Sequence, residues 1–311
     1  MNRRHLIFAA TGLLLARPAR AAAVTHSVLG QDRGHLSLIN GKGTVAWRTP
    51  CPGTAHDLHL LPSGNILTQT SAQNIVEMIP KGEVVWEYRA RPKPGYDGAV
   101  EIHAFQPLPD DTLMIAESGN RRILEVTRDG KIVKDIPLTV DKPHPHRDTR
   151  MARKLKNGNY LVCHESDGMV REYDATGKVV WSYALDLNNQ PRTPGHDGHG
   201  TEVFGAIRRA NGNTLIAGGN NNRVMEVDRK GSVVWSIERD ELPGIRLFWV
   251  TTLQELPNGN LVVGNCHAGP ENPQLFEVTR DKKVVWTFKN WDIFGNNLAV
   301  AQITDVSGVN R

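Results

Sequence analysis

The chain has little of what stabilises a very small secreted protein or anchors a protein in a membrane. Its 311 residues include only three cysteines, Cys51, Cys163 and Cys266. An odd number leaves at least one thiol without a partner, and the sequence does not say whether the other two pair. Helical periodicity is not sustained anywhere. After the N-terminal segment, no apolar run approaches the roughly 20 residues that a membrane-spanning helix needs. These absences exclude a disulfide framework, a helical bundle and a membrane span in the mature chain.

The N-terminal segment, residues 1–23, is predicted to be a cleaved secretory signal. Arg3 and Arg4 precede an apolar stretch at 6–16, and Ala-Arg-Ala at 19–21 matches a small-residue cleavage site. The paired arginines resemble a twin-arginine export signal, with an ordinary secretory signal as the alternative. We therefore expect a periplasmic or secreted bacterial protein whose mature part, residues 24–311, is a single domain.

Neither sign of charge is in excess in the mature part. The whole chain has 37 Lys and Arg against 33 Asp and Glu. Four arginines and no acidic residue lie in residues 1–23, so 33 basic residues face 33 acidic ones in the rest. A balanced chain gives no electrostatic reason to expect a nucleic-acid partner.

What the chain does contain is a repeat. Each block has a turn rich in Pro, Asn and Gly, two short strands joined by a polar loop, and a second turn before a Val-Val-Trp strand. Asn-Gly pairs favour two-residue hairpins, and self-similarity at roughly 40 to 50 residues is typical of propellers and solenoids. Four antiparallel strands per repeat describe a propeller blade. The closing tryptophans are Trp47, Trp86, Trp181, Trp235 and Trp286, and Lys134 takes this place in a sixth block.

We predict an all-β fold with six four-stranded antiparallel blades in one ring. The first block, residues 25–47, provides only three strands, whereas residues 298–306 have strand character and no hairpin partner. Joining this C-terminal strand to the N-terminal blade closes the ring and removes the free edges. The repeated tryptophans and glutamates are expected to serve the blades rather than a ligand. The glutamates are Glu77, Glu125, Glu172, Glu226 and Glu277.

The recurring unit N-G-N-x-L … E-V-D-x-x-G-x-V-V-W resembles the repeat of bacterial arylsulfotransferases and of PQQ-like propeller proteins. The resemblance covers nearly all of residues 24–311 as a repeat pattern. Arylsulfotransferases transfer sulfate between phenols through a histidine in the channel, with further histidines and an arginine around it, and the resemblance implies the same for this chain. It does not imply a PQQ group, because the dehydrogenases that use PQQ resemble eight-bladed rings.

Histidines and arginines gather where the predicted blades begin. His56, His103 and Arg150 lie eight residues before the first turn in three consecutive blades, so we expect them along one arc of the channel mouth. By the resemblance these three are the candidate catalytic residues, with a histidine as nucleophile or acid/base. Long loops on a rigid scaffold often carry function, and they supply the candidate ligand-binding residues Asp57, His59, His146, His196 and His199.

Three interpretations of these residues stay open. In the first, the mouth binds a small anionic molecule and transfers or hydrolyses a group. In the second, imidazoles converge on a divalent metal such as zinc or copper. In the third, the loops share no ligand, and the propeller is a scaffold that presents one face to a protein or polymer partner. The candidate metal ligands are His56, His103, His146 and His199.

Overall fold

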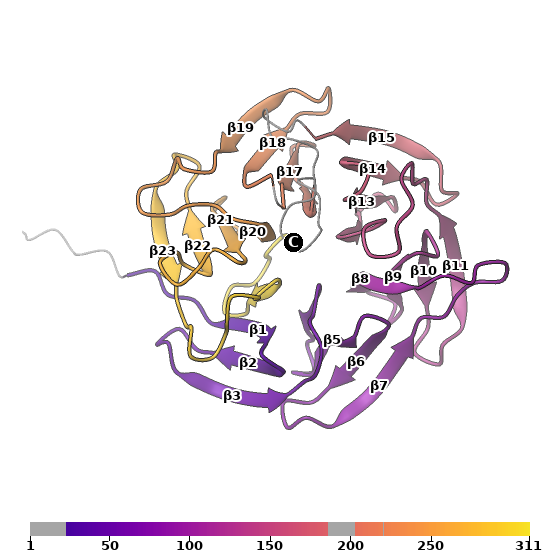
Figure 1. The fold of residues 1–311 in the computed structure, drawn as a ribbon, viewed down its shortest axis with the longest axis horizontal. Coiled ribbons are helices and arrows are strands. Elements are labelled where there is room, and N and C mark those ends of the chain that lie inside the picture. The colour runs from indigo at the N-terminus through magenta and orange to yellow at the C-terminus, as the bar shows by residue number, and fades with distance from the viewer. Residues whose placement is uncertain (1–22, 186–202, 220) are drawn as a thin grey trace, which may run out of the picture.

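The computed structural model describes residues 23–185, 203–219 and 221–311. Six four-stranded antiparallel sheets surround a central channel (Figure 1), which confirms the predicted six-bladed propeller. Within the described ranges, the search for a helix long and apolar enough to cross a membrane finds none.

The blades follow one another in chain order, and in each the four strands run from the channel to the rim. Blade 1 has β24 (Ala301–Ile303), β1 (Val28–Asp32), β2 (His35–Ile39) and β3 (Val45–Pro50); blade 2 has β4 (His59–Leu60), β5 (Ile66–Ser71), β6 (Asn74–Met78) and β7 (Val84–Arg89). Blade 3 has β8 (Glu101–Pro107), β9 (Leu113–Ser118), β10 (Arg122–Val126) and β11 (Ile132–Pro137); blade 4 has β12 (Ala152–Lys154), β13 (Tyr160–His164), β14 (Met169–Tyr173) and β15 (Val179–Ala184). Blade 5 has β16 (Gly205–Arg208), β17 (Thr214–Ala217), β18 (Val224–Val227) and β19 (Val233–Ile237); blade 6 has β20 (Val250–Glu255), β21 (Leu261–Asn265), β22 (Leu275–Val278) and β23 (Val284–Phe288).

The ring closes as predicted, by a C-terminal strand that joins the N-terminal blade. β24 pairs antiparallel with β1, with Val28 opposite Ile303 and Gly30 opposite Ala301. In Figure 1 the yellow end of the chain lies beside the indigo strand β1. The strand is shorter than the 298–306 expected from the sequence, because only three residue pairs share the ladder.

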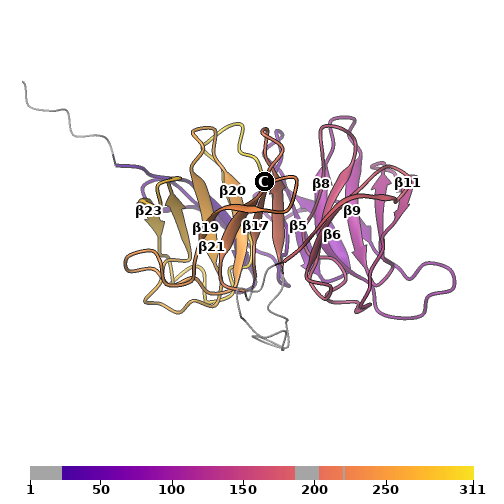
Figure 2. The ribbon, with the colours of Figure 1, turned by 90° about the horizontal axis from the view of Figure 1, so that it is seen from above.

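The two ends of the channel are structurally different. Because strands alternate in direction, the hairpin turns between the first and second and between the third and fourth strands lie on one side of the ring, which we call the turn face. The connections from blade to blade lie on the other side, the connection face (Figure 2). Each innermost strand therefore starts at the connection face and ends at the turn face.

The turns obey the repeat even where glycine is missing. Gly64, Gly158 and Gly259 have positive φ angles of 85°, 88° and 84°. Asp111 and Lys282 stand at equivalent places in other turns and adopt the same left-handed conformation, with φ of 61° and 63°. Non-glycine residues pay a steric cost there, so the framework, and not the residue type, imposes the turn.

The repeated glutamates have the structural role expected of them. In four blades, an asparagine of the first turn donates a side-chain hydrogen bond to the glutamate of the third strand. This bond ties the turn to a buried carboxylate, which would be costly to leave without partners. The pairs, measured from Asn Nδ2 to Glu Oε1, are Asn65–Glu77 (2.7 Å), Asn159–Glu172 (2.8 Å), Asn213–Glu226 (2.6 Å) and Asn260–Glu277 (2.6 Å).

The repeated tryptophans join neighbouring blades. The indole N–H groups of Trp86, Trp181 and Trp235 donate to the carbonyl oxygens of arginines in the next blade's second turn, at 2.6, 3.1 and 2.8 Å. The apolar clusters also lie between sheets, for example where Leu215 of blade 5 and Leu261 of blade 6 belong to one cluster. The apolar core thus holds neighbouring blades together.

The cysteines form no disulfide. Cys51, Cys163 and Cys266 are buried and have free thiols. Burial raises the pKa of Cys51 to about 11 and that of Cys163 above its usual range, so both are protonated at neutral pH. The question of pairing that the sequence left open is therefore settled by the fold.

Candidate functional site

The connection face brings together histidines from three consecutive blades. His56 lies just before β4, His103 lies on β8, and His146 lies in the segment that leads to β12. The ring centroids of His56 and His103 are 4.7 Å apart, and that of His146 is 5.2 Å from His103 and 6.3 Å from His56. The register argument from the repeat therefore predicted the proximity of His56 and His103.

His103 owes its orientation to an irregularity in its strand. In the ladder between β8 and β9, Ile102 is opposite Glu117 and Ala104 is opposite Ala116, which leaves His103 as the extra residue of a bulge. Bulges of this kind re-aim a side chain. The His103 Nδ1 lies 2.7 Å from the carbonyl oxygen of Thr149 in the next blade, which fixes the plane of the ring.

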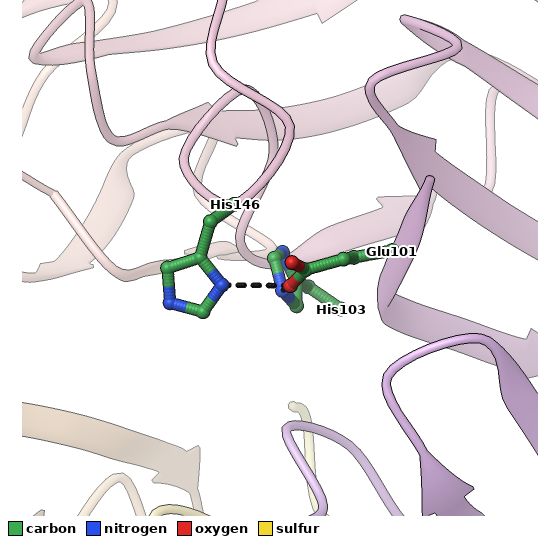
Figure 3. A group of neighbouring side chains, drawn as sticks. All are labelled: Glu101, His103 and His146. Carbon is green, nitrogen blue, oxygen red and sulfur yellow. Dashed lines mark hydrogen bonds and ion pairs between the residues drawn. The ribbon is translucent and has the colours of Figure 1, made fainter. Parts of the chain in front are cut away.

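Glu101 joins this cluster, although the sequence analysis did not select it. Its Oε2 lies 3.0 Å from His103 Nε2 and 2.7 Å from His146 Nδ1 (Figure 3). One ligand atom from each of the three residues lies within 4.8 Å of the other two. The available signal was the Glu-x-His spacing at the start of one predicted inner strand, where residues two apart share a face.

The electrostatic setting keeps His56 and His103 neutral and the Glu101 carboxylate charged. Burial, together with the charge of Arg150, lowers the pKa of His103 to about 4. Burial is also the main cause of a pKa of His56 well below 6.5, to which His103 and Arg150 add. Burial alone would raise the pKa of Glu101, but its hydrogen bonds to His103 and His146 outweigh this and hold the pKa well below its usual range.

Arg150 lies beside the histidines, and a buried carboxylate balances its positive charge. Its side chain is fully buried and forms an ion pair with Glu165, which is itself buried. The guanidinium carbon lies 5.6 Å from the ring centroid of Phe204. The Arg150 charge is close enough to lower the pKa values of His56 and His103. Its binding of an anion stays a prediction, because Glu165 already matches its charge.

Two of the predicted ligand-binding residues face a different set of partners. Asp57 accepts hydrogen bonds from Arg153 Nη1 and Nη2, at 2.6 and 3.0 Å, and from Arg311 Nη2 at 3.3 Å. The His59 Nε2 lies 2.7 Å from the carbonyl oxygen of Phe105. Neither residue has a hydrogen bond or ring contact with His103 or His146 among those the structure gives. Asp57 therefore pairs with arginines further along the channel. The predicted residues His196 and His199 lie outside the described residues.

The arrangement has the chemistry of a metal centre. One carboxylate and two imidazoles point at a common place, and the Nδ1–H of one imidazole is held by a backbone carbonyl. Hydrogen bonds of this kind orient metal-binding histidines and fix their tautomer. Zinc sites that carry out chemistry commonly have three protein ligands and one open position. The neutral His56 ring beside these residues could accept a proton from a bound molecule.

Solved structures with similar folds give three comparisons. A protein of unknown function from Bacteroides caccae is 23% identical, with a TM-score of 0.74 over 89% of this chain and 98% of that one. Streptogramin B lyase is 14% identical, with a TM-score of 0.56 over 83% and 76% of the two chains. A catalytically inactive histidine-to-alanine variant of virginiamycin B lyase from Staphylococcus aureus, with quinupristin, is 13% identical, with a TM-score of 0.54 over 87% and 86%. At these identities the likeness shows the fold.

Sequence comparison places the chain in a family but gives no individual relative. None of the curated proteins matches it. The resemblance to arylsulfotransferases stays a prediction, whereas the PQQ-like repeat is shown by a family model that matches residues 32–288. Since that match covers well over half of the sequence, the chain belongs to the PQQ-like repeat family that is described as outer membrane protein assembly factor BamB.

Proposed function

We propose that the chain is an exported propeller that binds a divalent metal ion at its connection face through Glu101, His103 and His146. The ion would serve acid–base chemistry on a small molecule, with His56 as the base. The single observation that carries this proposal is the contact between His103 Nε2 and Glu101 Oε2, at 3.0 Å. Export rests on the arginine pair and the apolar segment within residues 1–23.

The contact calls for a cation. A carbonyl oxygen only accepts hydrogen bonds, so the Nδ1 of His103 carries the proton that it donates to Thr149. With a pKa of about 4, His103 is neutral at pH 7, and its Nε2 then carries a lone pair. That lone pair faces an oxygen of the ionised Glu101. Two acceptors at this distance repel each other unless a cation lies between them, and in a buried site the cost is high. That cation is either a proton that makes His103 an imidazolium, which donates from both ring nitrogens, or a metal ion, and we propose the metal ion.

The donor set fits a borderline metal such as Zn²⁺. Imidazole nitrogen and carboxylate oxygen are both zinc ligands, and imidazole also suits copper, iron and nickel. Ligand atoms around a tetrahedral zinc lie about 3.3 Å apart when the bonds are about 2.05 Å long. To match this spacing, the separations of 3.0 Å and 2.7 Å at Glu101 Oε2 would widen by about 0.3 Å and about 0.6 Å. The His146 side chain is 36% exposed, so solvent and ligand reach this side of the centre.

The lyases among the similar folds indicate a reaction class for the proposal. A bound metal ion supplies Lewis acidity that polarises a carbonyl. His56 Nδ1 is buried without a hydrogen-bond partner among the described residues, and the ring is neutral at pH 7. It is therefore available to take a proton from the carbon next to a carbonyl. The C–H electron pair then forms a carbon–carbon double bond as the carbon–oxygen bond on the adjacent carbon breaks, and the ester group leaves as a carboxylate. We propose lyase-type cleavage of a small molecule with an ester or similar bond.

Metal binding tests the first part of the proposal. Calorimetric titration of the metal-free protein with ZnCl₂ should give one site per chain, and Glu101→Gln should weaken it at least about tenfold. His35→Gln is the matched control, because His35 is a partly exposed histidine on β2, outside the cluster. Parent protein that binds no stoichiometric Zn²⁺, Mn²⁺, Ni²⁺ or Cu²⁺ while fully folded would remove the metal centre.

Turnover tests the second part. Metal-loaded protein should cleave quinupristin, the molecule present with the virginiamycin B lyase variant, which serves as the first probe. His56→Ala should abolish this while retaining zinc. A metal-loaded parent that leaves quinupristin and a panel of simpler ester substrates intact would end the lyase proposal and leave the metal site standing.

Group transfer is a second candidate, favoured by the neutral His56 beside the charge of Arg150. A neutral imidazole with a free nitrogen is a competent nucleophile, as the arylsulfotransferase resemblance requires. An aryl-sulfate turnover assay with His56→Ala and His103→Ala as comparisons decides this, and an inactive parent would exclude it. If both activities and metal binding fail, the scaffold interpretation is the one left.

A further inference from the structure

A cavity lies at the turn face, at the opposite end of the channel from the histidine cluster. Its volume is about 1200 Å³, larger than the 300–1,000 Å³ typical of small-molecule sites. The walls are the ends of the innermost strands and the first turns of blades 4, 5 and 6, together with residues 308–311. A smaller cavity adjoins it and shares Gln106, Arg153, Asn310 and Arg311 with it.

Positive charge dominates this cavity. Seven basic side chains line it, and ion pairs join six of them to carboxylates, but those carboxylates number only five: Asp57, Glu125, Glu172, Glu226 and Glu255. Several carboxylates are shared. Arg153 and Arg311 both bind Asp57, and Arg208 and Arg229 both bind Glu172. Two of the five are shared further, Glu226 with Arg280 and Glu125 with Lys134. Within the described residues the cations therefore outnumber their counter-charges.

Some of the guanidinium donors are also without acceptors. Arg208 Nε and Arg311 Nη1 are buried and have no hydrogen-bond partner among the described residues. The Arg208 side chain is only 11% exposed and that of Arg311 only 14%, so water satisfies them poorly. Burial, with Arg153 nearby, lowers the pKa of Arg311 to about 10. Burial together with Arg229 also lowers the pKa of Arg208. The groups that carry the unmatched positive charge thus include the buried guanidinium groups of Arg208 and Arg311.

We infer that the turn-face cavity is a binding site for a small organic polyanion that carries phosphate or sulfate groups. Guanidinium groups match the geometry of such oxyanions and bind them with paired hydrogen bonds. A multiply charged ligand supplies both the missing negative charge and the missing acceptors. The exposed Lys156 at the rim adds a flexible cation at the opening. This site is separate from the proposed metal centre and does not depend on it.

Calorimetric titration with two probes tests the inference. Sodium tripolyphosphate represents a phosphate source and sucrose octasulfate a sulfate source. One or both should bind saturably to the parent protein in buffer with 150 mM NaCl, and the stronger of the two identifies the source of the anion. Because dissolved ions screen the attraction between exposed charges, the affinity of the cavity for the probe should fall as salt is added.

Paired variants separate the cavity from a general charge effect. Lys156→Gln combined with Arg229→Gln removes two cavity cations, and the Arg229 side chain is 51% exposed, so folding should be retained. This double variant should bind the stronger probe at least about tenfold more weakly. Lys131→Gln with Lys178→Gln removes two exposed lysines of other turns, outside the cavity lining, and should bind like the parent. No saturable binding of either probe by the folded parent, or equal losses in the two double variants, would overturn the inference.

Discussion

The two ends of the channel show opposite chemistry on one set of strands. At the connection face, three imidazoles and one carboxylate lie together, and Arg150 beside them is paired with Glu165. At the turn face, seven basic side chains surround a large cavity. The sequence analysis expected one mouth that combined histidine chemistry with anion binding. In the structure the larger group of basic side chains lies at the opposite end, past the Asp57–Arg153 ion pair, whereas anion binding beside the histidines, at Arg150, stays a prediction.

The separation follows from how a propeller uses its innermost strands. Residues that begin these strands, such as His56, His103 and Arg150, meet at one face. Residues that end them, such as Arg153 and Arg208, meet at the other. A few residues along the strand thus decide which site a side chain joins. We expect four measurable effects of this division. The largest concerns the ion pairs of Asp57 between the two ends, and the smallest concerns the repeated framework of the blades.

Replacing Asp57 should disrupt the buried ion pairs that lie between the two ends of the channel. Asp57→Asn leaves Arg153 and Arg311 without their shared carboxylate in a buried place. Removing one partner of a buried ion pair typically costs 3–5 kcal/mol, so we expect a loss of about 3 kcal/mol in the free energy of unfolding, measured with urea. Asp135→Asn is the control, since this partner of Arg122 is 49% exposed and such pairs contribute about 0–1 kcal/mol. Equal losses of unfolding free energy in both variants would show that the ion pairs of Asp57 contribute no more than an exposed pair.

Two histidine variants should distinguish the proposed metal ligand from the proposed base at the connection face. His146→Ala removes a proposed ligand and should weaken zinc binding by about 10- to 100-fold. His56→Ala should change it by less than about threefold, because His56 is absent from the group whose ligand atoms converge. Calorimetry with ZnCl₂ on both variants measures this. A larger loss for His56→Ala would reverse the assigned roles of base and ligand.

Acid should weaken the connection-face side of the ring while leaving the guanidinium charges unchanged. His164, behind this face, is fully buried between the carbonyl oxygen of Asp148 and the hydroxyl of Tyr173. Burial lowers its pKa from 6.5 to about 4. The folded pKa is the lower one, so the unfolded chain binds the extra proton. The stabilisation is complete above pH 6.5 and falls as the pH decreases toward 4.

The expected slope for this one histidine is up to about 1.4 kcal/mol per pH unit. Urea unfolding at pH 7, 6 and 5 measures it. His164→Gln cannot titrate and should show a slope smaller by up to that amount. An unchanged slope would mean that His164 does not stay neutral in the folded protein.

The smallest effect should come from the repeated framework that supports both ends. Trp235→Phe removes the hydrogen bond to the carbonyl oxygen of Arg280 and reduces the stacking with its guanidinium, which lies 4.0 Å from the ring centroid. We expect a loss of about 1 kcal/mol in the free energy of unfolding. Val234→Thr, at a side chain 53% exposed beside it, should change it by less than about 0.5 kcal/mol. Zinc and tripolyphosphate binding should be unchanged in both variants.

Much of the fold followed from local patterns. Asn-Gly turns, strand alternation and the closing tryptophans depend on interactions between near neighbours, so they predicted the six blades and the closure by the C-terminal strand. The same register predicted that His56 and His103 would meet. Asp111 and Lys282 also stand at the spacing of turn glycines in the repeat, and their φ angles are positive like those of the glycines.

The candidate site followed from the sequence only in part. Glu101 was missed because repeat spacing compares one position across blades, whereas Glu101 and His103 belong to the same strand and meet through a bulge. Asp57 was assigned to the histidine mouth because it follows His56 in the chain. In the structure the Asp57 carboxylate binds the guanidinium groups of Arg153 and Arg311, and its role in ligand binding stays a prediction.

The sequence by itself determined that this protein is a ring of six blades, because each blade is specified by turns and strands within roughly 50 residues of chain. Only the tertiary structure decided which charged side chains lie close to one another. Arg311 and Asp57 are separated by 254 residues in the chain, yet their side chains are in contact. Closing the ring creates such contacts, and the chemistry of both channel ends arises from them.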